Sequence, residues 1–374
     1  MKILNISQVD SVFADGSYPI ELLFFYKLKL KTERIRRALK KLSTTFWPLF
    51  GEYQAGQIRF NRYNENEYYD EMVLNEQFDT TLSYNALYEK YSRINPPVMQ
   101  KLFHLAIIQY SNGTILIPKM NHLAGDGYSY FYFLTALASV MRDPPIPFKA
   151  VLTRLLYKPH HYRTILRKFL FTERGLKQAL PDSQFTISYE ELPREEIQQT
   201  IRDIKSRHNL TISANDLLSA ISVKKLFSQQ KDFIHDSMQL TIPMDVRRQI
   251  PEYGRRYFGN ALLFKTITFP RQTLRESEVN IIAMDIRKSI PAMTKEGYIT
   301  YLKELEKLIT DEQFEKLKPY NPAYGCLVTN LTKMPAEHLD FGTGNPDFIF
   351  PLTIEKNSAA LLSHHNNYIL RLAY

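Results

Sequence analysis

The chain has 374 residues, of which 44% are hydrophobic and 23% charged, so it is long enough to bury a large core and is unlike disordered sequences. Its single cysteine, Cys326, excludes an intramolecular disulfide and indicates a reducing compartment, and no stretch approaches the roughly 20 apolar residues that span a bilayer, so we expect a cytoplasmic protein. The formal net charge of +9 favours acidic ligands, but zinc-finger spacing, a ribonucleoprotein motif and a basic recognition helix are all missing, which argues against nucleic acid.

The first 142 residues predict an α/β domain, because apolar residues recur with helical spacing in some stretches and alternate in others. Residues 32–43 are charged and amphipathic, as in a helix, and residues 128–141 predict a second helix without Pro or Gly. Strands are predicted at residues 57–61, 102–110 and 114–120. Three prolines within residues 144–147 then end the second helix and force an extended path.

The rest of the chain also combines predicted helices with predicted strands. Helices are predicted at residues 194–207, 213–225 (with Ser213 as N-cap), 276–289 and 301–317. Strands are predicted at residues 239–242 and 261–268, and as a hairpin of residues 359–363 and 368–373 with its turn at Asn366-Asn367. We therefore divide the chain into a first domain at residues 1–142, a crossover at 143–182 and a second domain at 183–374.

The crossover carries a basic stretch in which arginines and lysines are interleaved with apolar residues. From Arg163 onward the spacing predicts a cationic amphipathic helix. Such a helix either packs on the core as an ordinary surface element or lies on an anionic membrane or partner.

A His-x-x-x-Asp-Gly sequence at residues 122–127 separates the strand at 114–120 from the helix at 128–141. This position places His122 at the end of a strand, beside small residues that let the chain turn, with Gly127 allowing a tight turn before the helix. A histidine in such a cleft is a candidate general base, since it titrates near neutral pH. On its own the motif is short, and a lone histidine is more often a structural residue.

Two later motifs strengthen the interpretation. Asp245-Val246-Arg247 is followed by Tyr257-Phe258-Gly259-Asn260, and Asp340-Phe341-Gly342-Thr343-Gly344 lies near the C-terminus. In this order the three motifs resemble those of the BAHD acyltransferases, which belong to the chloramphenicol acetyltransferase and condensation-domain superfamily. The resemblance implies two similar chloramphenicol-acetyltransferase-like domains, each a mixed sheet flanked by helices, with a channel between them.

The same resemblance implies the chemistry. His122 would take a proton from a hydroxyl or amine, which then attacks the thioester of acyl-CoA, a co-substrate, without an acyl-enzyme. Asp126 and Arg247 would form a buried ion pair that supports His122, and the loop with Asp340 and Gly342 would be structural, at the edge of the channel. The family is also expected to be monomeric and to need no other cofactor.

The sequence departs from the family pattern in the predicted substrate pocket. Thr343 stands where the family has Trp, and Asn330-Leu331 stands where it usually has Ser-Trp. We expect Thr329 and Asn330 to donate hydrogen bonds to substrate, and Asn260 to line the donor side. No metal is expected, because the adjacent pairs His160-His161 and His364-His365 point to opposite faces of a strand.

Two other functions remain open at this point. The first is a condensation-type acyltransferase that takes its acyl group from an acidic carrier protein docked on the basic surface. The second is a catalytically inactive relative that binds a ligand or protein through the channel, although the intact His122 argues against it.

Overall fold

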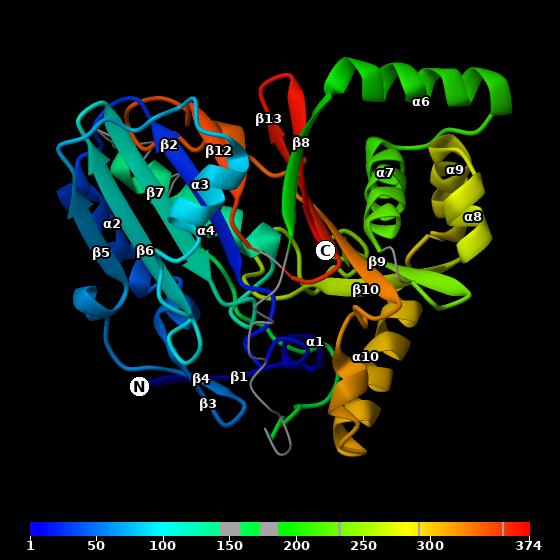
Figure 1. Ribbon diagram of the computed structural model, residues 1–374. Coiled ribbons are helices and arrows are strands. Elements are labelled where there is room, and N and C mark those ends of the chain that lie inside the picture. Colours follow the sequence, from blue (N-terminus) through cyan, green and yellow to red (C-terminus); the bar gives the residue numbers. More distant parts are fainter. Residues whose placement is uncertain (143–157, 173–185, 231–232, 291, 354) are drawn as a thin grey trace.

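The computed structural model describes residues 1–142, 158–172, 186–230, 233–290, 292–353 and 355–374. Figure 1 shows two lobes, each built around a β-sheet, with the N-terminal half of the chain forming most of one and the C-terminal half most of the other. The predicted mixed α/β architecture of two sheet-centred domains is thereby confirmed. None of the described helices is long and apolar enough to cross a membrane.

The first lobe is a five-stranded sheet with helices on both faces. In spatial order its strands are β12 (Phe348–Pro351), β2 (Ile20–Tyr26), β7 (Gly113–Met120), β6 (Phe103–Tyr110) and β5 (Tyr69–Val73), of which only β5 and β6 are parallel neighbours. Successive side chains of a strand point to opposite faces, so Phe24 joins the core under α2 (Thr32–Ser43) and α4 (Gly127–Met141), whereas Phe25 joins the core under α3 (Tyr84–Tyr91). A small sheet of β1 (Lys2–Asn5), β4 (Gln57–Phe60) and β3 (Glu52–Gln54) lies beside this lobe.

The second lobe is a six-stranded sheet. In spatial order its strands are β10 (Leu262–Pro270), β9 (Ser237–Asp245), β11 (Gly325–Asn330), β13 (Ser358–His364), β14 (Asn367–Ala373) and β8 (Ile187–Pro193). Its remaining helices are α6 (Arg194–His208), α7 (Ala214–Gln229), α8 (Arg271–Glu276), α9 (Val279–Ser289) and α10 (Lys295–Thr310). One face of the sheet packs on α7 and α9 and includes Cys326, which is fully buried in that core. The other face is left to form the site described below.

Strand β12 connects the two lobes. It follows most of the second lobe in sequence, yet it pairs with β2 of the first sheet, with Phe348 opposite Phe25. The chain then returns to the second sheet at β13. Residues 183–374 therefore do not all lie in the second lobe, because an edge of the first sheet is completed by this later strand.

Two of the predicted helices have different bounds in the structure. The helix predicted at 276–289 corresponds to α9, which begins later, at Val279, because Ser277 adopts an extended conformation that ends the separate helix α8 at Glu276. The predicted helix at 301–317 begins earlier, at Lys295, where the Thr294 side chain accepts a hydrogen bond from the Gly297 N–H. It ends at Thr310, before a separate 3₁₀ turn at Phe314–Leu317.

The cationic helix predicted from Arg163 onward is wrong over its described part. Residues 161–172 contain no helix, and Arg163 is buried rather than exposed. The physical reason is that its guanidinium donates to the Ala124 carbonyl and lies 3.7 Å from the Asp10 carboxylate. The anionic-membrane hypothesis loses its basis here, and the rest of the predicted crossover, at 143–157 and 173–182, lies outside the described residues.

Candidate active site

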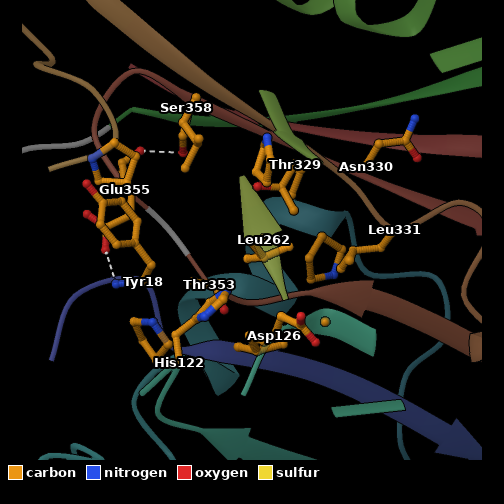
Figure 2. Close-up of a pocket in the computed structure, with 18 of the residues that line it drawn as sticks. Tyr18, His122, Asp126, Leu262, Thr329, Asn330, Leu331, Thr353, Glu355 and Ser358 are labelled. Atoms are coloured by element: carbon orange, nitrogen blue, oxygen red, sulfur yellow. Dashed lines mark hydrogen bonds between the residues drawn. The ribbon is translucent and has the colours of Figure 1, made fainter. Parts of the chain in front are cut away.

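A pocket opens between the lobes, at the end of β7 and against the face of the second sheet that lies opposite α7 and α9. Figure 2 shows Tyr18, His122 and Asp126 on the side of the first lobe and Leu262 and Thr329 on the side of the second. Much of the wall is apolar, which lowers the local dielectric and strengthens electrostatic interactions with the few polar groups inside.

His122 is held in place by packing on one side and hydrogen bonding on the other. The chain leaves β7 at Met120, and Asn121 fixes the turn by accepting a hydrogen bond from the Leu123 N–H and donating to the Val98 carbonyl. The half-buried imidazole then stacks on Phe13, with ring centroids 3.9 Å apart and an interplanar angle of 18°.

Asn260 fixes the tautomer of this imidazole. Its amide nitrogen donates to Asp10 Oδ1 at 2.8 Å and to the His122 carbonyl at 2.8 Å, and neither of these oxygens can donate in return. The amide oxygen of Asn260 therefore faces His122 Nδ1, at 3.0 Å, and Nδ1 must carry the proton. The remaining nitrogen, Nε2, is left with a free lone pair.

The surroundings keep the His122 ring neutral. Burial lowers the pKa of His122 below its ordinary value of 6.5, and the opposing influences of Asp126, Asn260 and Asp10 do not restore it. A neutral imidazole with its proton on Nδ1 can accept a proton at Nε2 at physiological pH.

Asp126 and Arg247 form the buried ion pair expected between them. The two terminal guanidinium nitrogens of Arg247, Nη1 and Nη2, donate to the two carboxylate oxygens of Asp126, at 2.8 and 2.9 Å, and both side chains are at least 95% buried. Asp126 also caps α4 by accepting from the Ser129 N–H, and it accepts from the Ala261 N–H. Although burial alone would raise the pKa of Asp126, Arg247 and these backbone donors hold it below its ordinary value.

The pair ties the loop that carries His122 to the segment that carries Asn260. Arg247 donates in addition to the Gly259 carbonyl, and the Ser129 hydroxyl bonds both the carbonyl and the N–H of Gly259. A side chain at Gly259 would collide with the guanidinium of Arg163. The glycine of the Tyr-Phe-Gly-Asn motif is therefore required by close packing.

Comparison with known proteins identifies the family of the chain. The sequence profile of the Transferase family, the BAHD acyltransferases, matches residues 2–367. The chain belongs to this family. It is accordingly an acyltransferase, as the three motifs predicted. None of the curated proteins compared with it matches.

Solved structures of BAHD enzymes share the fold at low sequence identity. TRI101 of F. graminearum, complexed with ethyl coenzyme A, is 12% identical with a TM-score of 0.74, over 100% of this chain and 95% of that one. TRI101 of F. sporotrichioides, complexed with coenzyme A and T-2, is 12% identical with a TM-score of 0.69, over 99% and 94%. Vinorine synthase is 15% identical with a TM-score of 0.71, over 100% and 90%.

The Asp340 loop of the BAHD pattern lies away from the pocket residues. Asp340 Oδ1 accepts from the N–H groups of Gly342 and Gly344, which both have positive φ, and Phe341 packs edge-on against Tyr26. The Arg142 side chain at the end of α4 donates to the Asp340 carbonyl. The loop therefore holds β2 and α4 together, and none of these six residues lines the pocket.

The three residues expected to bind substrate take different positions relative to the pocket. Thr329 lines the pocket, and its hydrogen bond to substrate stays a prediction. Asn330 also borders it, but its amide points away in Figure 2 and is engaged with Asn215 and Thr332. Asn260 is fully buried behind His122 instead of lining a wall, because both of its amide donors are used inside the protein.

Gly127 does not have the positive φ that would require a glycine, and the atom nearest to an added Cβ is the end of the flexible Leu331 side chain. Gly127 is the first residue of α4, and a Cβ there would approach Leu331 Cδ2 to 2.9 Å. The tight-turn explanation for this glycine is therefore wrong.

Sequence reasoning missed two supports of the site, Asp10 and Phe13. Asp10 belongs to α1 (Gln8–Ser11), where Ser7 and Asp10 form a reciprocal capping box. The Ser-x-x-Asp spacing is a helix-start signal visible in the sequence, but nothing in it indicates that the carboxylate also faces Asn260. Among the described residues, no cluster of three or more His, Cys, Asp or Glu side chains could hold a metal ion.

Proposed function

We propose that this BAHD enzyme transfers an acyl group from acyl-CoA to the hydroxyl or amine of a small acceptor, with His122 as general base. The observation that carries the proposal is the hydrogen bond from His122 Nδ1 to Asn260, which leaves a neutral Nε2 free beside the pocket between the lobes. Coenzyme A appears in the TRI101 complexes, one of which also holds T-2.

The reaction would proceed by direct attack. Nε2 takes the proton from the acceptor as its oxygen or nitrogen bonds to the thioester carbonyl carbon. The tetrahedral oxyanion then collapses, the carbon–sulfur bond breaks, and the thiolate of CoA leaves and takes up the proton from His122. Cys326 is an unsuitable nucleophile, since it lies in the core on the opposite face of the sheet and burial raises the pKa of its thiol.

In this scheme the other polar residues of the site position the base. Asn260 holds the ring in one tautomer and orientation, and the Asp126–Arg247 pair fixes the two segments that carry His122 and Asn260. Of the two residues expected to donate hydrogen bonds to substrate, Thr329 stays the candidate, because Asn330 is engaged elsewhere.

The test is release of free CoA thiol from a panel of acyl-CoAs, supplied together with a panel of small alcohols and amines. His122→Ala should lower turnover by roughly 10²–10⁴-fold, the usual contribution of a positioned base. His208→Ala is a matched control, since His208 is exposed at the end of α6. Unchanged turnover in the His122 variant would contradict the proposal.

A second measurement addresses the covalent alternative. Wild-type protein incubated with acyl-CoA alone should show no added acyl mass in intact-protein mass spectrometry. A stoichiometric adduct that is lost when acceptor is added would establish an acyl-enzyme and exclude direct transfer.

A further inference from the structure

Arg371 occupies an unusual place on the second sheet. It lies in the middle of β14, where its neighbours Leu370 and Leu372 face the core formed with α7. Because side chains alternate along a strand, Arg371 points to the opposite face and lines the pocket. Strand register places it opposite Ala360 of β13, which in turn lies opposite Thr329 of β11.

The guanidinium of Arg371 is buried without a carboxylate partner. The residue is only 4% exposed. Nη1 donates to Ser358 Oγ at 2.9 Å and approaches the Ser358 carbonyl at 3.5 Å, while Nε has no hydrogen-bond partner. No Asp or Glu of the described residues lies within ion-pair distance of it.

The two other buried arginines of the described chain differ in this respect. Arg247 is paired with Asp126, and Arg163 lies beside Asp10. In both cases burial would lower the pKa, but the neighbouring carboxylate more than compensates and the pKa is raised. At Arg371 the effect of burial is larger than that of the neighbouring groups, and the pKa of the guanidinium is lowered. An isolated buried cation is costly, so it is retained where another group supplies the counter-charge.

Within the protein, Glu355 is the acidic residue that comes closest to neutralising the charge of Arg371. It lines the same pocket and interacts electrostatically with Arg371, but it forms no ion pair with it. Its carboxylate instead accepts a hydrogen bond from the Tyr18 N–H at 2.9 Å, and burial raises the pKa of Glu355 to about 6. Figure 2 shows Glu355 beside Tyr18 at the border of the pocket.

We propose that Arg371 binds a carboxylate group of a substrate, carried by either the acyl chain or the acceptor. This inference rests on the proposed transfer of an acyl group within the same pocket. The planar guanidinium donates in a fork that matches a carboxylate, and the apolar surroundings strengthen such a charged hydrogen bond. Ser358, which is bonded to Arg371 and to the Glu355 carbonyl, orients the fork.

The experiment compares near-isosteric charged and neutral ligands by titration calorimetry on the full-length protein. In the donor arm, malonyl-CoA is compared with acetoacetyl-CoA, and free CoA is the reference. In the acceptor arm, with CoA present, lactate, 3-hydroxybenzoate and 4-hydroxycinnamate are each compared with their methyl esters. The arm in which the acid binds more tightly than its neutral counterpart identifies which substrate carries the carboxylate.

Arg371→Met is the decisive variant. It should weaken binding of the acid by on the order of 100-fold and leave the neutral counterpart within a few fold, since removing one partner of a buried charge pair is costly. Arg371→Lys should recover only part of the loss, because an ammonium lacks the fork geometry. Glu355→Gln should tighten binding of the acid by removing a like charge, and it keeps the residue's size.

Three outcomes would overturn the inference. The first is that wild-type protein does not prefer an acid in either arm. The second is that Arg371→Met weakens all CoA ligands equally, which would assign the arginine to the phosphates of CoA. The third is that both Arg371→Met and Glu355→Gln unfold at much lower temperature, which would make them a structural pair. Failure of the proposed function is distinguishable, since wild-type protein would then bind no CoA compound at all.

Discussion

Two arginines border the same pocket and are used in opposite ways. Arg247 has its charge satisfied by the protein: it donates to both oxygens of Asp126, to Asp245 and to the Gly259 carbonyl. Arg371, on strand β14, is bonded only to Ser358 among the described residues. Both are at least 95% buried, so exposure does not distinguish them.

The two arginines show that one pocket can contain two kinds of buried charge. One kind is neutralised within the protein, and the other is neutralised only when a ligand binds. A buried charge with all its partners in the protein stabilises one arrangement of the chain and offers nothing to a substrate. A buried charge without a counter-ion destabilises the protein, and this cost is offset when an ion of opposite sign binds. The variants below test this contrast in order of decreasing effect.

Removing the Asp126 carboxylate that pairs with Arg247 should have the largest effect on stability. Asp126→Ala leaves the buried Arg247 with only the part-exposed Asp245 as an acidic partner and removes the cap of α4, which we expect to cost about 3–5 kcal/mol of unfolding free energy in urea titrations. Asp245→Ala is the matched control. Its side chain is 41% exposed, so its contact with Arg247 should contribute at most about 1 kcal/mol. Equal losses in the two variants would contradict the structural role of Asp126.

Removing the group that orients the base should mainly affect catalysis. Asn260→Ala frees the His122 ring to change tautomer and orientation, and we expect turnover to fall on the order of 10²-fold with little change in KM. Because the hydrogen bond that His122 Nδ1 donates to Asn260 raises the pKa of His122, removing it should also move the acidic limb of the pH–rate profile to lower pH. A lower yield of folded protein with an unshifted profile would indicate a purely structural role.

The pH dependence of the wild-type enzyme follows from His122. Since burial lowers its pKa, the base is neutral at pH 7, and the rate should stay level on acidification until the pH falls below 6.5 and then drop about tenfold per unit. Acidification should also lower the stability of the protein. The contribution of the neutral, buried His122 to the unfolding free energy is complete above pH 6.5, where the unfolded histidine is also neutral, and it is lost as the pH falls towards the lowered pKa of the folded state. A rate that already falls between pH 8 and 7 would contradict a neutral base.

Replacing Arg371, which has no ion-pair partner among the described residues, should have the smallest effect on stability. Arg371→Met leaves the Ser358 hydroxyl with its bond to the Glu355 carbonyl, and it removes a buried charge that has no ion pair. We expect the unfolding free energy to stay the same or to rise by up to about 1 kcal/mol, as when buried charges are replaced by apolar groups. A loss comparable to that of Asp126→Ala would show that the two arginines are not used differently.

Much of the fold could be predicted from sequence where the signal is local. The charged amphipathic pattern at Thr32–Ser43 gave the bounds of α2, and Ser213 caps α7 as expected. The stretch from Arg163 failed because periodicity reports which side chains are apolar, but not whether a charge is neutralised by a distant carboxylate such as Asp10. The β12 strand could not be placed either, since strand pairing across more than 300 residues leaves no local pattern.

For the site, the sequence by itself determined the motifs: His122 at the end of a strand, and Asp126 and Arg247 as a pair expected from the family resemblance. Only the tertiary structure decided that Asn260 lies behind the imidazole and that Arg371 faces the pocket without a counter-ion. The physical reason is that a motif fixes the chemistry of a side chain and its spacing along the chain. Whether a charge or an amide finds a partner depends on distances between segments that meet only after both sheets have formed.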